Sequence, residues 1–124
     1  MREIKFRGYG KDAKRWIYGS LLDEKSVGIV AIQDEDCHVY AVEPESVGQY
    51  TGFRDCEGHE IYEGDVIQVV TKNPYWAFKK NYAVEWGLDG FNLDGDTLYS
   101  WFKFHTLKVI GNIYDNPELL RCES

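Results

Sequence analysis

The sequence predicts a mainly β fold, a small, partly open SH3-like barrel built from hairpins with a short C-terminal helix; an α+β arrangement is the alternative. Short apolar runs recur between turn residues at a regular spacing, and several alternate apolar and charged side chains with period two. Aromatic residues, which suit pleated sheets, make up 15% of the 124 residues. This length fits one domain, with an N-terminal hairpin region, residues 1–43, packed on a barrel core at residues 47–115.

The first part of the chain predicts a hairpin followed by two further strands. In "EIKFR", Ile4 and Phe6 alternate with charged residues, which is the pattern of a half-buried strand. "GYGKDAK" turns the chain and "RWIYGSLL" returns, so residues 3–22 predict a β-hairpin. The apolar run "VGIVAIQ" predicts a buried strand, and "CHVYAV" predicts another strand after an acidic break.

The central stretch "VGQYTGFRDCEGHEIYEGDVIQV" also predicts a hairpin. Pro44, just before it, marks a change of direction. The strand-like runs "SVGQYTGF" and "EIYEGDVIQVV" flank the turn "RDCEGH", whose Gly58 adopts positive φ at low cost. Gly64 and Asp65 predict a bend that leads into a long curved strand.

The last third predicts more strands and a terminal helix. The strand segments are "NYAVEWG", "FNL", "TLYSWFKFH" and "LKVIGNIY". "NPYWAFKK" predicts a loop or a single helical turn, because Asn-Pro interrupts regular structure. In "DNPELL", Asn116 is a candidate N-cap, Pro117 takes the first helical position and Glu118 suits the helix dipole.

Cysteine usage favours a reducing compartment. Cys37, Cys56 and Cys122 are odd in number and widely spaced, so we expect free thiols, with one disulfide as the alternative. The sequence shows neither a signal-peptide stretch nor an apolar run long enough to cross a membrane. We therefore expect a cytoplasmic protein with no membrane association.

The formal charge of −7 is distributed unevenly along the chain. Residues 1–20 hold six basic and two acidic side chains (+4), residues 21–70 hold two and twelve (−10), and residues 71–124 hold six and seven (−1). Solvated strand faces explain this pattern, and self-complementary charge that favours association is the alternative.

Two Cys-His pairs suggest a metal site, but their spacing argues against one. Cys56 and His59 have the spacing of half a zinc site, whereas a structural zinc site normally shows two such pairs. Cys37 and His38 are adjacent, and adjacent side chains in a strand point to opposite faces. We predict no metal ligands and no cofactor.

Catalytic motifs are also missing from the sequence. It contains no G-x-S-x-G, P-loop or G-x-G-x-x-G pattern, and no local signature pairs a Cys or Ser nucleophile with a His. The carboxylates of residues 55–65 could include an acid of raised pKa, but charges that alternate with apolar residues usually cover a solvated face. We predict a protein that is not an enzyme and has no catalytic or cofactor-binding residues.

The segment "YWAFKKNY" supports an alternative function. It combines Tyr75, Trp76, Phe78 and Tyr82 with two lysines, the composition of a platform on which bases of single-stranded nucleic acid stack. The acidic total argues against this function, and aromatic residues also close barrel cores. Nucleic-acid binding is therefore the alternative to protein association.

Three blocks of the sequence carry a family resemblance: "MREIKFRGYGKDAKRWIY", "VGQYTGFRDCEGHEIYEGDVI" and "VIGNIYDNPELL". Together they resemble the YopX-type proteins, which are small proteins encoded by bacteriophages and prophages. The residues that match the central motif of the family are Gly48, Gln49, Thr51, Gly52, Asp55, Gly58, Ile61, Tyr62, Gly64 and Asp65. The turn "FRDCEGHE" of this chain differs from the lysine-rich turn that is common in the family. The resemblance therefore gives Cys56 no catalytic role.

The resemblance implies a mainly β fold with a barrel-like core, oligomeric assembly and a phage or prophage context, and it carries over no catalytic residue. The motif residues have structural explanations: glycines permit bends, Ile61 and Tyr62 pack, and Asp55 and Asp65 cap turns. We expect a non-enzymatic phage or prophage accessory protein that associates with itself, as a homo-oligomer, or with a host or phage protein.

Overall fold

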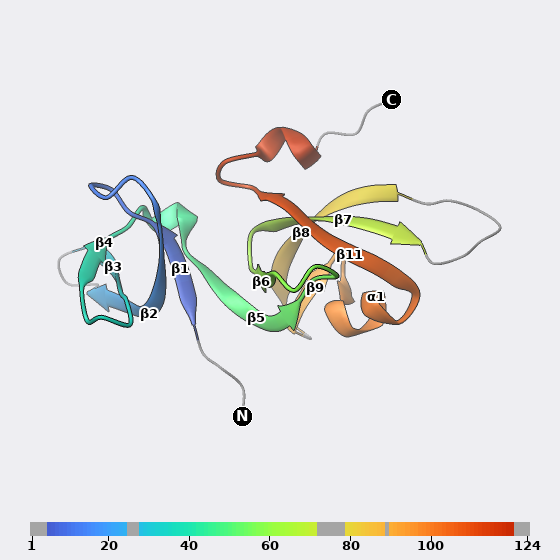
Figure 1. Ribbon diagram of the computed structural model, residues 1–124, viewed down its shortest axis with the longest axis horizontal. Coiled ribbons are helices and arrows are strands. Elements are labelled where there is room, and N and C mark those ends of the chain that lie inside the picture. Colours follow the sequence, from blue (N-terminus) through green and yellow to red (C-terminus); the bar gives the residue numbers. More distant parts are fainter. Residues whose placement is uncertain (1–4, 25–27, 72–78, 89, 121–124) are drawn as a thin grey trace. The chain divides into compact units, whose positions relative to one another are not determined.

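The computed structural model describes residues 5–24, 28–71, 79–88 and 90–120. The chain divides into two compact units, Met1–Tyr50 and Thr51–Ser124. The division falls within one strand, β5 (Gly48–Arg54), which runs from the first unit into the second (Figure 1). The fold is mainly β, in antiparallel sheets that do not close, and this confirms the predicted class. Packing of the hairpin region on the core stays a prediction.

The first unit is a twisted set of antiparallel strands. Its elements are β1 (Phe6–Tyr9), β2 (Trp16–Glu24), β3 (Ile29–Gln33), β4 (Val39–Ala41), the 3₁₀ turn η1 (Pro44–Ser46) and the beginning of β5. Within the sheet their order is β4-β3-β2-β1-β5. The predicted N-terminal hairpin is confirmed, because β1 pairs with β2 from Phe6↔Gly19 to Tyr9↔Trp16.

A small core stabilises the first unit. Ile17, Ile32 and Val42 are buried together, and they come from β2, β3 and the segment after β4. Phe6 and Leu21 pack against them. The alternation predicted for β1 is incomplete, because Arg7 is buried whereas Phe6 is only partly buried. In β3 the consecutive residues Ala31 and Ile32 are both buried, as expected for a continuous apolar run.

The second unit contains the remaining elements. After the end of β5 these are β6 (Glu60–Tyr62), β7 (Asp65–Thr71), β8 (Lys79–Gly87), β9 (Gly90–Leu93), β10 (Asp96–Thr97), α1 (Leu98–Phe104), β11 (His105–Asn112) and the 3₁₀ helix η2 (Pro117–Leu120). Strand β6 neighbours β5, and the other five strands form a sheet in the order β10-β9-β8-β7-β11.

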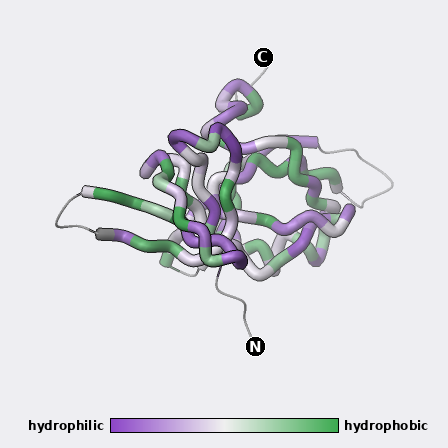
Figure 2. The backbone as a smooth tube through the Cα atoms, turned by 60° about the vertical axis from the view of Figure 1, so that its left-hand side comes forward, coloured by the Kyte–Doolittle hydropathy of each residue, from purple (hydrophilic) through white to green (hydrophobic). Residues whose placement is uncertain are grey.

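The core of the second unit surrounds β7. Ile67 and Val69 of this strand are buried with Val84 of β8, Leu93 of β9 and Leu107 of β11. Along the strands, hydrophobic and hydrophilic residues interleave (Figure 2). β7 lies between β8 and β11 and can therefore bury several apolar side chains in succession.

One predicted strand is wrong, because Leu98–Phe104 of "TLYSWFKFH" forms the helix α1. Leu98 is buried and Trp101 packs against the same core, so the inward positions follow helical spacing. Thr97 caps the helix, since its hydroxyl accepts a hydrogen bond from the Ser100 N–H. Aromatic residues in succession favour a strand, but the cap and the packing outweigh that preference.

Two other predictions are refined. The run "EIYEGDVIQVV" contains two strands, β6 and β7, and the predicted bend at Gly64–Asp65 separates them. The terminal helix is a 3₁₀ helix, with Pro117 at its start as predicted. Asn116 directs its Oδ1 to the Asn112 N–H at 3.3 Å, away from the first turn of η2.

Candidate functional site

Two turns that begin with an aspartate contain the Cys-His pairs singled out in the sequence. One joins β3 to β4 with the sequence "DEDCH", residues 34–38, and the other joins β5 to β6 with "DCEGH", residues 55–59. Both have the pattern Asp, any residue, an acidic residue, any residue, His. This repeated spacing was visible in the sequence but was not recognised there as a shared structure.

In the second unit the turn is organised by Asp55. Its Oδ1 accepts hydrogen bonds from the N–H groups of Glu57 and His59, each at 2.9 Å. Its Oδ2 accepts a third from the N–H of Val109 in β11, also at 2.9 Å. The side chain of Asp55 is fully buried. The predicted capping role of Asp55 is therefore confirmed.

This turn also covers an outer edge of the five-stranded sheet. β11 is the last strand of that sheet. The Cys56 N–H donates to the Leu107 carbonyl at 3.0 Å, next to the bond from Val109 to Asp55. An open strand edge offers donors and acceptors to other chains. The "DCEGH" turn, which belongs to the same unit, forms hydrogen bonds with two of the backbone groups on this edge.

The first unit repeats the arrangement around Asp34. The N–H groups of Asp36 and His38 donate to its Oδ1 at 3.0 and 2.9 Å. In both turns the fourth residue has positive φ, 67° for Cys37 and 84° for Gly58. The same conformation is therefore adopted by a glycine in one unit and by a cysteine in the other.

The environment of Asp55 changes its acidity. Burial acts to raise its pKa, but the hydrogen bonds from Val109, His59 and Glu57 outweigh burial. Proximity of the His59 ring, whose Nδ1 lies 3.6 Å from Oδ2, acts in the same direction. The pKa of Asp55 consequently lies below its ordinary value of 3.8. The carboxylate is thus held in its charged form.

Asp55, Glu57 and His59 also have the composition of a metal site. One ligand atom from each lies within 4.8 Å of the others. However, both Asp55 oxygens already accept backbone hydrogen bonds inside the turn. Glu57 is exposed and its Oε1 lies 3.3 Å from Lys108 Nζ. Turn formation explains this cluster, and the absence of a metal ligand stays a prediction.

Other motif residues have structural roles as well. Asp65 is almost fully buried, and its Oδ2 accepts a hydrogen bond from the Tyr62 N–H at 2.7 Å, which confirms its predicted capping role. The Thr51 hydroxyl donates to the Ile61 carbonyl at 2.8 Å and accepts from the Phe53 N–H. The motif therefore specifies the β5–β6–β7 connections.

The described residues include two of the three cysteines and only the end of the aromatic segment "YWAFKKNY". Cys37 and Cys56 are free, as predicted, and both are exposed, whereas Cys122 lies outside the described residues. Most of the aromatic platform, including Trp76, also lies outside them. Its described end begins β8, where Lys80 Nζ lies 5.2 Å from the centre of the Tyr82 ring.

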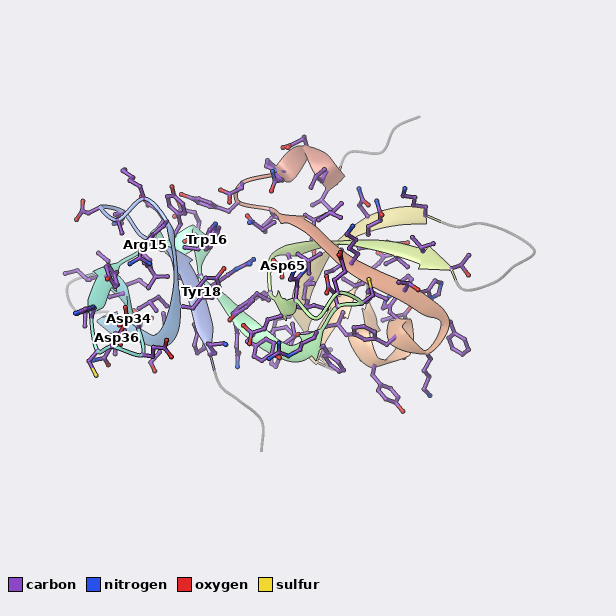
Figure 3. The ribbon with its side chains drawn as sticks, in the orientation of Figure 1. Arg15, Trp16, Tyr18, Asp34, Asp36 and Asp65 are labelled. Carbon is purple, nitrogen blue, oxygen red and sulfur yellow. The ribbon has the colours of Figure 1, made fainter. Side chains whose placement is uncertain are left out.

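A pocket of about 500 Å³ in the first unit was not predicted. It is lined by Lys5, residues 15–20 at the start of β2, and residues 33–36 at the end of β3. Figure 3 shows Trp16 and Tyr18 on β2, with Asp34 and Asp36 in the turn that follows β3. Pairing and turn geometry bring these segments together, and no spacing in the sequence signals this.

Large apolar side chains are exposed on the second unit. Trp86 and Leu88, at the end of the β8–β9 hairpin, are 60% and fully exposed. Tyr99 and Phe104 of α1 are 62% and 67% exposed. Contiguous apolar patches on a protein surface commonly mark interaction sites, whereas isolated exposed apolar residues are ordinary.

These features define a small, mainly β protein whose signature motif builds turns. The sequence profile of the YopX family, described as YopX protein, matches residues 5–121. The chain belongs to the YopX family.

Structural comparison agrees on the fold. The chain is similar to the crystal structure of protein EF1440 from Enterococcus faecalis, with a TM-score of 0.63 and 20% sequence identity over 98% of this chain and 100% of that one. No curated protein matches the sequence. Within the described residues, no helix has the length and apolar character needed to cross a membrane.

Proposed function

We propose that this protein is a non-enzymatic accessory protein of a phage or prophage and that it acts by protein association, first of all with a second copy of itself. The apolar end of the β8–β9 hairpin is the observation that carries the proposal. Trp86 pairs with Phe91 across the hairpin, and their ring centres lie 4.7 Å apart.

The inward-facing row of this hairpin continues beyond the core that covers it. Val84 and Leu93 form a cross-strand pair in which both side chains are buried. Trp86 follows Val84 by two positions and shares its face, yet most of its side chain is exposed. Aromatic side chains of this kind are enriched at the centres of protein interfaces. A partner that covers Trp86 and Leu88 would bury this apolar surface.

The structure of the motif supports a role without catalysis. Asp55, Asp65 and Thr51 use their side-chain oxygens to hold backbone groups of turns and strands. Side chains that hold the backbone in this way have a structural role. We therefore assign the function to the exposed surface and not to these motif residues. Single-stranded nucleic acid is not favoured as the partner, because residues 51–124 carry seven basic and twelve acidic side chains, a net −5.

Sedimentation velocity on a double variant tests the proposal. We expect Trp86→Ser with Leu88→Ser to weaken self-association by more than about tenfold, because each lost apolar contact contributes about 1.5–3 kcal/mol when fully buried. Ile29→Ser with Val39→Ser is the matched control, since it removes two exposed apolar side chains from the first unit. Equal weakening in both double variants, or no change in either, would contradict the role assigned to the hairpin end.

A further inference from the structure

The sheet of the first unit ends in a strand whose outer backbone edge is open. β4 is the outermost strand in the sheet order. His38 and Val42, on either side of it, form their backbone hydrogen bonds on the side of β3. Because alternate residues of an antiparallel strand face the same neighbour, the backbone groups of Val39 and Ala41 point away from β3.

Only the end of this edge is closed by the same unit. The Ala41 carbonyl accepts a hydrogen bond from the Lys11 N–H at 3.0 Å, next to the bridge between Gly10 and Val42. Among the described residues, no hydrogen bond engages the outward N–H of Ala41 or the outward N–H and carbonyl of Val39. Proteins commonly protect such edges with charged residues or proline, and β4 contains neither. The edge is therefore available to a strand from another chain.

The face of this sheet that points away from the core is apolar as well. Five residues of β2, β3 and β4 share it: Leu22, Ile29, Ala31, Val39 and Ala41. The neighbouring row, which contains Ile32, faces the core instead. Leu22, Ile29 and Val39 are 42%, 53% and 56% exposed, whereas Ala31 between them is 6% exposed. The water-facing side of an antiparallel sheet is ordinarily polar, so a contiguous apolar face indicates a surface that a partner covers.

Acidic residues flank β4 on both sides. Residues 34–46 hold five acidic side chains and no Lys or Arg, a net −5. Residues 10–15, the turn beside β4, hold three basic and one acidic side chain, +2, so the surroundings of the strand carry −3. A partner segment with basic residues at its ends complements this charge.

The same charges disfavour a second copy of this chain as the partner. In an antiparallel pair of two β4 strands, the residues before β4 in one copy lie beside the residues after β4 in the other. Glu35 and Asp36 would then approach Glu43 of the second copy, and like charges across a strand pair are destabilising. The edge consequently favours a different polypeptide.

We propose that β4 binds an extended segment of a different polypeptide as an added antiparallel strand, in which apolar residues alternate with polar ones and basic residues stand at both ends. The backbone of the segment pairs with Val39 and Ala41, and its apolar side chains extend the apolar face of the sheet. Main-chain hydrogen bonds provide affinity in this mode of recognition, and alternate side chains provide specificity. The surface is distinct from the β8–β9 hairpin end, to which self-association is assigned.

NMR titration of the ¹⁵N-labelled full chain with acetyl-Lys-Val-Thr-Val-Thr-Val-Lys-amide tests the proposal. We expect saturable shifts of the amides of residues 38–42, with a Kd on the order of 1 mM. At saturation, hydrogen exchange of the Val39 and Ala41 amides should slow, because the added strand accepts their hydrogen bonds. Exchange of the Tyr40 amide, which faces β3, should stay unchanged.

Modified peptides separate the contributions of backbone and charge. N-methylation of the three valines should abolish binding, because residues opposite Val39 and Ala41 direct their N–H groups to β4 in an antiparallel pair. N-methylation of the two threonines, whose N–H groups point away, should leave binding intact. Replacement of both lysines by glutamate should weaken binding about fivefold, as expected for the loss of two exposed ion pairs.

A pair of matched variants locates the apolar contact. Val39→Ser should weaken binding about fivefold, because it removes apolar surface that the peptide covers. Val70→Ser replaces an exposed valine of the second unit and should leave the affinity unchanged. Unchanged shifts elsewhere in the spectrum show that each variant is folded.

Four results would overturn the inference: no saturable shift, shifts centred outside β4, equal binding of the valine-methylated peptide, or unchanged affinity of Val39→Ser. Slower exchange of the Val39 and Ala41 amides when the chain alone is concentrated would also overturn it, because a second copy would then occupy the edge. A chain that self-associates through its hairpin end but ignores the peptide loses this inference alone. A monomeric chain that binds the peptide keeps the β4 surface and loses self-association.

Discussion

Asp34 and Asp55 occupy equivalent positions in two similar turns, but they differ in what surrounds them. Asp55 is fully buried and bonds to a third donor, Val109, on a neighbouring strand, whereas the Asp34 side chain is 21% exposed. Removal of a buried charged acceptor leaves buried N–H donors without a partner, whereas water can replace an acceptor near solvent. The buried acceptor therefore contributes more to the free energy of unfolding. The same residue type therefore has unequal importance in the two units.

Replacement of Asp55 by asparagine should show this inequality. The amide group keeps one acceptor and presents a donor where the second acceptor was, so we expect Asp55→Asn to lower the free energy of unfolding by about 2 kcal/mol. Asp34→Asn should lower it by less than about 1 kcal/mol, because water replaces part of the lost interaction. Urea denaturation at pH 7 measures both. Equal losses would contradict the role given to Val109.

The lowered pKa of Asp55 also predicts a pH dependence. Since its pKa is lower in the folded chain than in the unfolded one, its contribution is complete above the ordinary value of 3.8 and disappears as the pH falls through the folded-state value. We expect the stability difference between the native protein and Asp55→Asn to shrink as the pH falls below about 4. A difference that stays constant down to pH 2 would contradict the assignment.

Cys37 and Gly58 provide a matched pair for backbone strain. A left-handed conformation costs about 1–2 kcal/mol for a residue with a Cβ atom. We expect Gly58→Ala to destabilise by about 1 kcal/mol, although a Cβ there meets no atom within 4 Å. Cys37→Gly should stabilise by about 0.5 kcal/mol, since relief of strain exceeds the added entropy of the unfolded chain. Thermal melts of both variants check the opposite signs.

Among the elements, strands were easier to predict from the sequence than the helix. Period-two alternation in "EIKFR" and the turn residues of "RDCEGH" identified their hairpins, because these signals are local. Helix α1 was missed because its aromatic residues also suit a strand, and the Thr97 cap and the packing of Leu98 and Trp101 are what favour the helix. The pocket beside β2 was missed because it depends on the approach of Gln33 to Gly19, a tertiary contact.

The capping hydroxyl of Thr97 should decide how stable α1 is. Thr97→Ala removes the acceptor for the Ser100 N–H and should destabilise the protein by about 1 kcal/mol. Thr97→Ser keeps a capping oxygen and should cost only a few tenths of that amount. Hydrogen exchange of the α1 amides measures the effect locally. Equal protection in the alanine and serine variants would show that packing alone holds the helix.

At the scale of the whole molecule, residues of the YopX motif form the connections between strands, and we propose that the exposed apolar groups of the second unit bind a partner. Opposite formal charges at residues 1–20 and 21–70 can orient two copies, since unlike poles attract. Charge contributes mainly to orientation and rate, so burial of side chains such as Trp86 must supply most of the free energy of association.

Light scattering of the full chain at tens of micromolar, in moderate and in high salt, tests this account most directly. We predict a mass of at least two chains in both conditions, because added salt screens the charges but leaves apolar burial in place. Dissociation only in high salt would show that charge, and not apolar burial, holds the assembly together. The mass of a single chain in both conditions would contradict self-association.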